Sequence, residues 1–153
     1  MLGALTEAPD LNRLLAGSPF ARYLGINAAI DDAGVLATLA ARDSLVGNVS
    51  LPALHGGAIA AFLEITCLLQ LAYETGSAVP ARTIDFSVEY LRPGRPELVF
   101  ARANIRRLGR RVATVHAEAW QRDVNAPVCL VQCHLRLPTG MAEAASATGT
   151  PRG

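Results

Sequence analysis

The segment HGGAIAAFLE, residues 55–64, places a histidine and two glycines ahead of an apolar run that ends in one acid, Glu64. Backbone N–H groups at the start of a helix have no partner within the helix, and glycines let a ligand carbonyl come close. His55, Gly56 and Gly57 therefore fit a site that polarises a carbonyl oxygen. By itself, HGG also fits a flexible joint between a loop and a helix.

Glu64 lies in an unusual setting for an acid. The apolar residues of segment 58–71 cover nearly every face of the expected helix, as in a helix surrounded by protein. Burial raises the pKa of a carboxyl group because it disfavours the charged form, so a buried acid needs a partner or a function. Glu64 fits either a desolvated catalytic acid or a helix face at the surface, where it meets water or an arginine.

The helix start and the acid do not reach one atom within a chain. Glu64 follows His55 by nine residues, which corresponds to about two and a half turns and about 13 Å along a helix axis. A second chain could bring the two together. We therefore predict a homodimer in which each active site uses the helix start of one chain and Glu64 of its partner.

Composition narrows the class of protein. The chain has 153 residues, with 51% hydrophobic and 18% charged residues, which is typical of a globular protein with one domain. A formal net charge of +1 gives no field to attract nucleic acid. Three cysteines without a C-x-x-C pair favour neither a disulfide framework nor a zinc site, so we expect no metal and a reduced, cytoplasmic setting.

The elements that would position these residues can be read along the chain. We expect a single domain over residues 1–137 and a disordered tail over 138–153. The expected elements are short helices at 11–15 and 18–25, a hairpin within 26–41, a loop at 43–54, the long helix up to Gly76, and strands at 82–91, 98–106, 112–121 and 128–137. The longest apolar stretch is interrupted by polar residues and is shorter than the roughly 20 residues of a membrane span, and the acidic start lacks the features of an export signal.

The clearest strand is RTIDFSVEYL, in which apolar and polar residues alternate. A period of two predicts that Ile84, Phe86, Val88 and Tyr90 bury one face. The opposite, polar face with Asp85, Ser87 and Glu89 could meet solvent or a second dimer. The order of elements predicts an α+β protein with one long helix against a single antiparallel sheet.

Three motifs carry a resemblance to a known family. LHGGAIAAFLE, TIDFSVEYLRP and RRLGRRVATVHAEAW occur in this order between about residues 18 and 137. They resemble the hotdog-fold acyl-CoA thioesterases of the phenylacetate-degradation (PaaI-like) type. The resemblance implies one long central helix wrapped by a single antiparallel sheet.

The resemblance also implies roles for single residues. The Gly57 N–H would polarise the thioester carbonyl, and His55 would shape the helix start. Glu64 would be the general base or the nucleophile, and Thr83 would assist the acid or orient water. The family places an asparagine or glutamine six residues before the histidine, where this chain has Val49. Asn48 is the nearest amide, so the loop must bulge or shift to bring it in.

An arginine-rich segment, RRLGRR, surrounds a predicted turn. A solvated hairpin tip explains it, and so does a clamp for the phosphates of coenzyme A. The resemblance places Gly109 and Arg110 near the coenzyme A end of the site, with Arg110 as the first choice and Arg111 beside it.

The sequence thus predicts an enzyme that hydrolyses an aromatic or short- to medium-chain acyl-CoA to a free acid and thiol. No cofactor is expected, because coenzyme A is part of the substrate. An acyl carrier protein thioester is a further substrate to consider, and a tetramer of two dimers is a further assembly. A hotdog hydratase or dehydratase and a non-catalytic acyl-CoA-binding protein stay open as alternatives.

Overall fold

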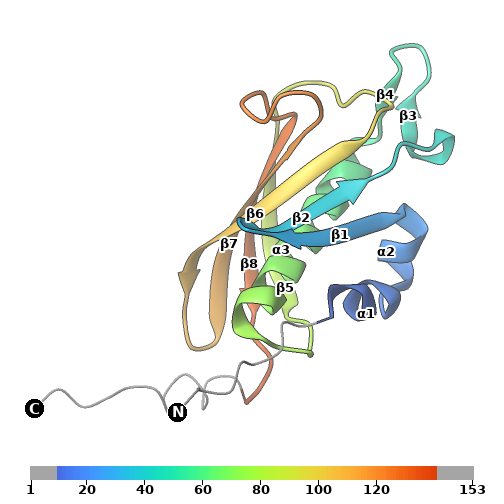
Figure 1. Cartoon of the computed structure of the whole chain (residues 1–153). Helices are drawn as coiled ribbons and strands as arrows, with labels where there is room; N and C mark the ends of the chain where they lie inside the picture. The colour runs from blue at the N-terminus through green and yellow to red at the C-terminus, as the bar shows by residue number, and fades with distance from the viewer. Residues whose placement is uncertain (1–9, 141–153) are drawn as a thin grey trace, which may run out of the picture.

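The computed structural model of the chain describes residues 10–140, so most of the predicted tail at 138–153 lies outside the described residues. The main feature is a six-stranded sheet in the order β1-β2-β6-β7-β8-β5, in which every neighbouring pair is antiparallel (Figure 1). Its strands are β1 (Ile26–Asp31), β2 (Gly34–Leu39), β5 (Arg82–Tyr90), β6 (Val99–Leu108), β7 (Val112–Trp120) and β8 (Cys129–Arg136).

One long helix, α3 (Gly56–Thr75), packs against one face of this sheet. It begins after the N-cap residue His55 and ends at Gly76, which adopts a left-handed conformation with φ 68°. Phe62 and Leu63 are fully buried between the helix and the sheet. The helix is long and apolar enough to cross a membrane, but 56% of its most apolar 18-residue window is buried inside the protein. The predicted α+β arrangement is confirmed.

Two short helices, α1 (Leu11–Ala16) and α2 (Pro19–Leu24), precede the sheet as the sequence predicts. The Ser18 hydroxyl accepts a hydrogen bond from the Ala21 N–H at 3.2 Å and caps α2. Gly25 ends α2 with φ 74°, a conformation that favours glycine. Local capping signals are therefore sufficient to set both ends of α2.

The prediction of a loop at 43–54 is wrong in part. The segment contains three short elements: the 3-10 helix η1 (Asp43–Leu45) and a two-stranded sheet of β3 (Val46–Asn48) and β4 (Ala53–Leu54). The Leu54 N–H donates to the Gly94 carbonyl at 2.8 Å. This bond joins residues far apart in the chain, so the local composition of the segment could not reveal it.

The prediction that β5 buries one apolar face is wrong for a single chain. Phe86 is 38% exposed and Tyr90 is 55% exposed. The reason is the position of α3, which packs mainly across β2, β6, β7 and β8, whereas β5 lies at the edge of the sheet. The face of β5 toward the helix is thus left uncovered, and so are the backbone groups along its free edge.

The prediction of a helix surrounded by protein also needs correction. One stripe of α3 is only half-buried, and it consists of Ala58, Ala61, Glu64, Ile65 and Leu68. Each of these residues lies three or four positions from another member of the set, and Glu64 and Ile65 are neighbours, which places all five on one face of the helix. We call them the α3 stripe. Its composition is apolar except for one carboxylate.

Candidate active site

The start of α3 is shaped by His55. The His55 Nδ1 accepts a hydrogen bond from the Gly57 N–H at 3.0 Å. Because Nδ1 is an acceptor, the neutral ring carries its proton on Nε2. The Gly57 N–H is therefore already satisfied, whereas the Gly56 N–H has no hydrogen-bond partner within residues 10–140. The free donor at the helix start belongs to Gly56.

A pocket of about 360 Å³ opens beside this free donor. We call it the helix-start pocket, and it is lined by Ala53, Leu54, Gly56, Ile59, Tyr90, Leu91, Arg92, Pro93 and Gly94. Tyr90 lies against Gly56, because a Cβ added at Gly56 would be 3.1 Å from the Tyr90 ring and hydroxyl. Sequence reasoning assigned Tyr90 only to a buried strand face. The missed signal is that Tyr90 is the last residue of β5, and this end of the strand lies against the first residue of α3.

Asn48 lies in a strand that bulges. The register of β3 with β4 shifts between Val46, which is opposite Leu54, and Asn48, which is opposite Ala53. Directly opposed residues share a face, so Asn48 lies on the side of Ala53 and not on that of Val46. Ala53 and Leu54 both line the helix-start pocket, so the two short strands lie beside it. The loop thus has the bulge that the sequence required, and the role of Asn48 stays a prediction.

The side chain of Asn48 is also oriented. Its Oδ1 accepts hydrogen bonds from the Ser50 N–H and the Leu51 N–H, both at 3.0 Å. This local turn uses the oxygen of the amide and leaves the Nδ2 group as the donor. Gly47 permits the bulge, because a Cβ there would lie 2.8 Å from the His55 Cα.

Glu64 stands in the middle of α3, on the α3 stripe, and is half-buried. Within the described part of the chain, its carboxylate takes part in none of the hydrogen bonds or ion pairs. If a partner chain or a substrate covered the α3 stripe, this carboxylate would be buried, and a fully buried acid is rare unless it is paired. Because Glu64 stands in the middle of α3, it lies apart from the helix start, as the sequence predicts.

A second bulge, in β5, changes the face of Thr83. The register of β5 with β8 shifts between Thr83, which is opposite Leu135, and Asp85, which is opposite His134. Because Leu135 is fully buried toward α3, the half-buried Thr83 lies on the helix side of the sheet. Strict alternation with Phe86 would place it on the other side. The bulge is held from that other side, where His134 Nδ1 is 2.8 Å from Asp85 Oδ1.

The arginines assigned to coenzyme A lie at the turn between β6 and β7. The Gly109 N–H donates to the Val112 carbonyl at 2.9 Å. A Cβ at Gly109 would lie 2.8 Å from that oxygen, so the tight turn requires glycine. Arg110 and Arg111 are exposed, as expected for a hairpin tip.

Strand register places the predicted residues at two ends of the sheet. Arg136 on β8 is opposite Arg82 on β5 and Val112 on β7, so Thr83 and the β6–β7 turn lie at the same end. Tyr90 and the helix start lie at the other end (Figure 1). We call the two sets the helix-start group (Asn48, His55, Gly56 and Gly57) and the turn group (Thr83, Gly109, Arg110 and Arg111). They do not meet within one chain.

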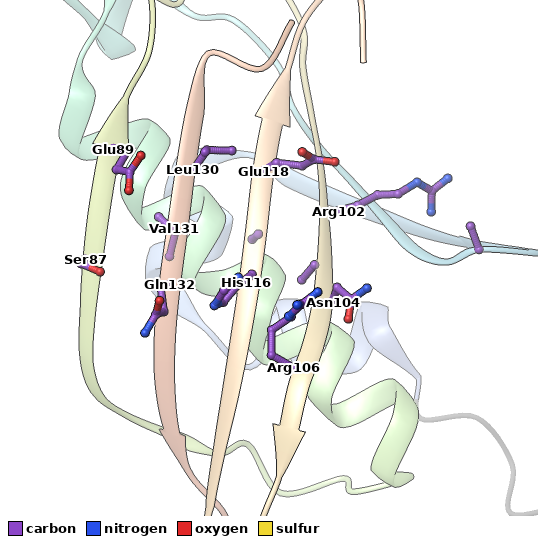
Figure 2. Close-up of a pocket in the computed structure, with 13 residues that line it drawn as sticks. Ser87, Glu89, Arg102, Asn104, Arg106, His116, Glu118, Leu130, Val131 and Gln132 are labelled. Carbon is purple, nitrogen blue, oxygen red and sulfur yellow. The ribbon is translucent and has the colours of Figure 1, made fainter. Parts of the chain in front are cut away.

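A larger hollow, of about 490 Å³, lies on the outer face of the sheet. Figure 2 shows its polar lining, which includes Ser87 on β5, Gln132 on β8, His116 on β7 and Arg106 on β6. These side chains point away from α3, because they alternate with buried residues such as Val115 and Cys133. None of the predicted site residues lines this hollow.

Comparison with known proteins decides the family. The model of the thioesterase superfamily matches residues 51–127, which is half of the chain. The chain belongs to the thioesterase superfamily. It is 37% identical over 87 residues to the medium/long-chain acyl-CoA thioesterase YigI of Escherichia coli K12, covering 48% of this chain and 56% of that protein. For the protein of the same name from Salmonella typhimurium LT2, the identity is 35% over 92 residues, covering 52% and 59%. The chain thus spans a little over half the length of these relatives.

Solved structures confirm the hotdog fold. A protein from Chromobacterium violaceum is 34% identical with a TM-score of 0.67, covering 84% of this chain and 89% of that chain. A phenylacetic acid degradation-related protein from Ralstonia eutropha JMP134, with thioesterase in its name, is 25% identical with a TM-score of 0.69, covering 83% and 98%. The predicted fold and the predicted resemblance to acyl-CoA thioesterases are therefore both confirmed.

Proposed function

We propose that this protein hydrolyses an acyl-CoA thioester to a free acid and coenzyme A. The observation that carries the proposal is that the chain has both a free backbone donor, at Gly56, and an unpartnered carboxylate on an apolar helix stripe within the described residues, at Glu64. Membership of the thioesterase superfamily and the names of the relatives support the same activity. A donor for the carbonyl and a base for water are the two groups that thioester hydrolysis needs.

The active site is shared between two chains. The helix-start group and Glu64 are separated along α3, and Thr83 lies at the opposite end of β5 from Tyr90. The free edge of β5, its uncovered face and the α3 stripe together offer an apolar surface next to unpaired backbone groups. If two β5 strands pair antiparallel, the helix-start group of one chain lies beside Glu64 and the turn group of the other. The homodimer is the unit of activity, and two dimers could form a tetramer.

The first chemical role is to hold the thioester carbonyl. We assign it to the Gly56 N–H, since the Gly57 N–H is bonded to His55 Nδ1. A backbone donor at the start of a helix stabilises the negative charge that develops on the oxygen, and the helix dipole adds to this effect. His55 then acts by fixing the helix start and not by touching the carbonyl.

The second role is to supply the attacking oxygen. In one route, Glu64 of the partner takes a proton from water as the water oxygen bonds to the carbonyl carbon. The C–S bond then breaks, and the proton passes to the thiolate of coenzyme A. In the other route, the carboxylate attacks the carbonyl carbon, and the C–S bond breaks to release the thiolate of coenzyme A and leave a mixed anhydride. Water then hydrolyses the anhydride to the free acid and the Glu64 carboxylate, and the proton it releases passes to the thiolate. Thr83 and the Asn48 Nδ2 group would orient the water or the carboxylate in either route.

Arg110 and Arg111 would bind phosphates of coenzyme A. Both are exposed at the same end of the sheet as Thr83, which is the end that pairing of β5 strands brings to the partner's helix start. Guanidinium groups bind phosphate oxygens through paired hydrogen bonds.

Three unpaired, buried cysteines support a reduced compartment, which for this activity is the cytoplasm.

The substrate's acyl group is apolar. The helix-start pocket is lined mainly by apolar residues such as Leu54 and Ile59. One set of relatives is named for medium- and long-chain acyl-CoA, and one structural neighbour is named for phenylacetic acid degradation. Aromatic, medium-chain and longer acyl groups are therefore the first classes to compare. A hydratase is less well supported, because His55 Nδ1 is engaged and only the protonated Nε2 is free, so the ring has no free basic nitrogen.

The test is thiol release from a panel of aromatic, short-, medium- and long-chain acyl-CoAs, followed with a colorimetric thiol reagent. We expect Glu64→Ala to lower kcat by at least about 100-fold, since it removes the base or nucleophile. The matched control is Glu118→Ala, an exposed acid on the outer face of β7, which should stay within about twofold of the wild type. Tight binding of coenzyme A with no release from any thioester would indicate a binding protein instead.

A further inference from the structure

Tyr90 lies beside the free N–H of Gly56, at the helix-start pocket. Its ring and hydroxyl pack against Gly56, and a Cβ at this glycine would be 3.1 Å from the Tyr90 oxygen. The backbone nitrogen of a residue is about 2.5 Å from its own Cβ position. The Tyr90 hydroxyl is therefore within about 5.6 Å of the Gly56 nitrogen.

This separation suits a single acceptor between the two groups. Two hydrogen bonds of about 2.8 to 2.9 Å can join donors that are up to about 5.7 Å apart through one oxygen. Within residues 10–140, neither the Gly56 N–H nor the Tyr90 hydroxyl has a hydrogen-bond partner. Both groups line the helix-start pocket. The two groups are thus free, close together and at the same pocket.

The state of the Tyr90 hydroxyl is suitable for donation. Burial, with a smaller contribution from Cys129, raises the pKa of Tyr90 from its ordinary value. The phenol therefore keeps its proton at neutral pH. Its strand end is also fixed, because the guanidinium of Arg92, two residues further along, donates to the Pro127 carbonyl at 2.7 Å.

We propose that the Tyr90 O–H is a second hydrogen-bond donor to the substrate's thioester carbonyl, beside the Gly56 N–H. This inference rests on the proposed thioesterase function and adds one residue to its site. Two donors on one oxygen stabilise the oxyanion of the transition state better than one. The glycine at position 56 then has a second purpose, since even a Cβ there would crowd the tyrosine at 3.1 Å.

The experiment compares Tyr90→Phe with the wild type on two coenzyme A analogues of equal chain length. One is a ketone, in which a methylene replaces the thioester sulfur and the carbonyl is kept. The other is an S-alkyl thioether, which has no carbonyl. By calorimetry, Tyr90→Phe should weaken binding of the ketone by about fivefold to tenfold, the value of one hydrogen bond. Binding of the thioether should stay within about twofold.

Turnover gives a second measurement. With the substrate selected from the panel, Tyr90→Phe should lower kcat by about 10- to 100-fold while KM changes little. Tyr23→Phe is the matched control, because Tyr23 is an exposed tyrosine that stacks on Phe20 in α2, and it should behave as the wild type.

Equal losses for the ketone and the thioether, or no loss for either, would overturn the role of Tyr90. These outcomes differ from a failure of the proposed function, in which the wild type itself releases no thiol from any acyl-CoA. The analogue comparison does not depend on turnover, so it judges the contact in both cases.

Discussion

Gly47 and Gly56 owe their places to close contacts and not to unusual backbone angles. A Cβ at Gly47 would lie 2.8 Å from the His55 Cα, and a Cβ at Gly56 would lie 3.1 Å from Tyr90. Neither glycine has a positive φ. At the residue scale, the candidate site is therefore a place where neighbouring groups pack closely against the backbone of glycines. The free N–H at this place comes from the start of the helix, and the lack of a side chain keeps it accessible to a ligand.

Thr83 gives a test at this scale. Thr83→Val keeps the shape of the side chain and removes the hydroxyl, so we expect kcat to fall by about 10-fold while the midpoint of unfolding changes little. Thr114→Val is the matched control, because Thr114 is also half-buried in a strand but lies on the outer face of the sheet. Equal kcat values for Thr83→Val and the wild type would remove Thr83 from the proposed site.

The residue types of the site could be predicted more easily than their contacts. Glu64 was recognisable because an acid interrupts an apolar helix, and the structure leaves it half-buried on a stripe. Tyr90 was not recognised, because its contact with Gly56 joins the end of a strand to the start of a helix 34 residues earlier. The bond that occupies the Gly57 N–H depends on the rotamer of His55, which no spacing rule gives.

At the scale of elements, α3 and the first hairpin are joined by Gln70. This buried side chain accepts a hydrogen bond from the Val35 N–H at 3.0 Å through Oε1, and its Nε2 donates to Glu74 Oε1 at 2.7 Å. Gly34 makes room for it in the turn, with φ 103°, because a Cβ at this glycine would lie 3.0 Å from Gln70 Oε1. The hairpin is thereby tied to the helix that carries the site.

We expect Gln70→Leu to lower the free energy of unfolding by about 1–3 kcal/mol, because it leaves the Val35 N–H without its partner in a buried position. Chemical denaturation would measure this loss. Gln132→Leu, at an exposed position on the outer face of β8, should change the value by less than about 0.5 kcal/mol. A Gln70→Leu protein as stable as the wild type would show that the bond contributes nothing net.

Elements with local signals were predictable, and irregular ones were not. The hairpin around Asp31 and Gly34 and the helix capped by Ser18 form where the sequence places them. The bulges near Asn48 and Thr83 depend on register with a neighbouring strand. The exposure of Phe86 depends on where α3 lies across the sheet. Alternation thus predicts which residues share a face but not what covers that face.

At the scale of the whole molecule, the arrangement of the two groups accounts for the proposed dimer. The helix-start group and the turn group lie at opposite ends of the sheet, and β5 runs between them along a free edge. A two-fold axis across this edge would bring the helix-start group of each chain next to the turn group of the other chain. The distance between His55 and Glu64 along one helix already indicated this from the sequence.

The most direct test of the shared active site is complementation between two inactive chains. One chain carries Glu64→Ala, and the other carries Gly56→Val, whose branched side chain would crowd Tyr90 and project into the lining of the helix-start pocket. Each variant alone should be folded by circular dichroism and inactive. The two are co-expressed with different tags, and the mixed dimer is purified through both tags. If the site combines two chains, the mixed dimer has one intact site and should show about half of the wild-type activity per dimer. A mixed dimer as inactive as its two parents would contradict the account.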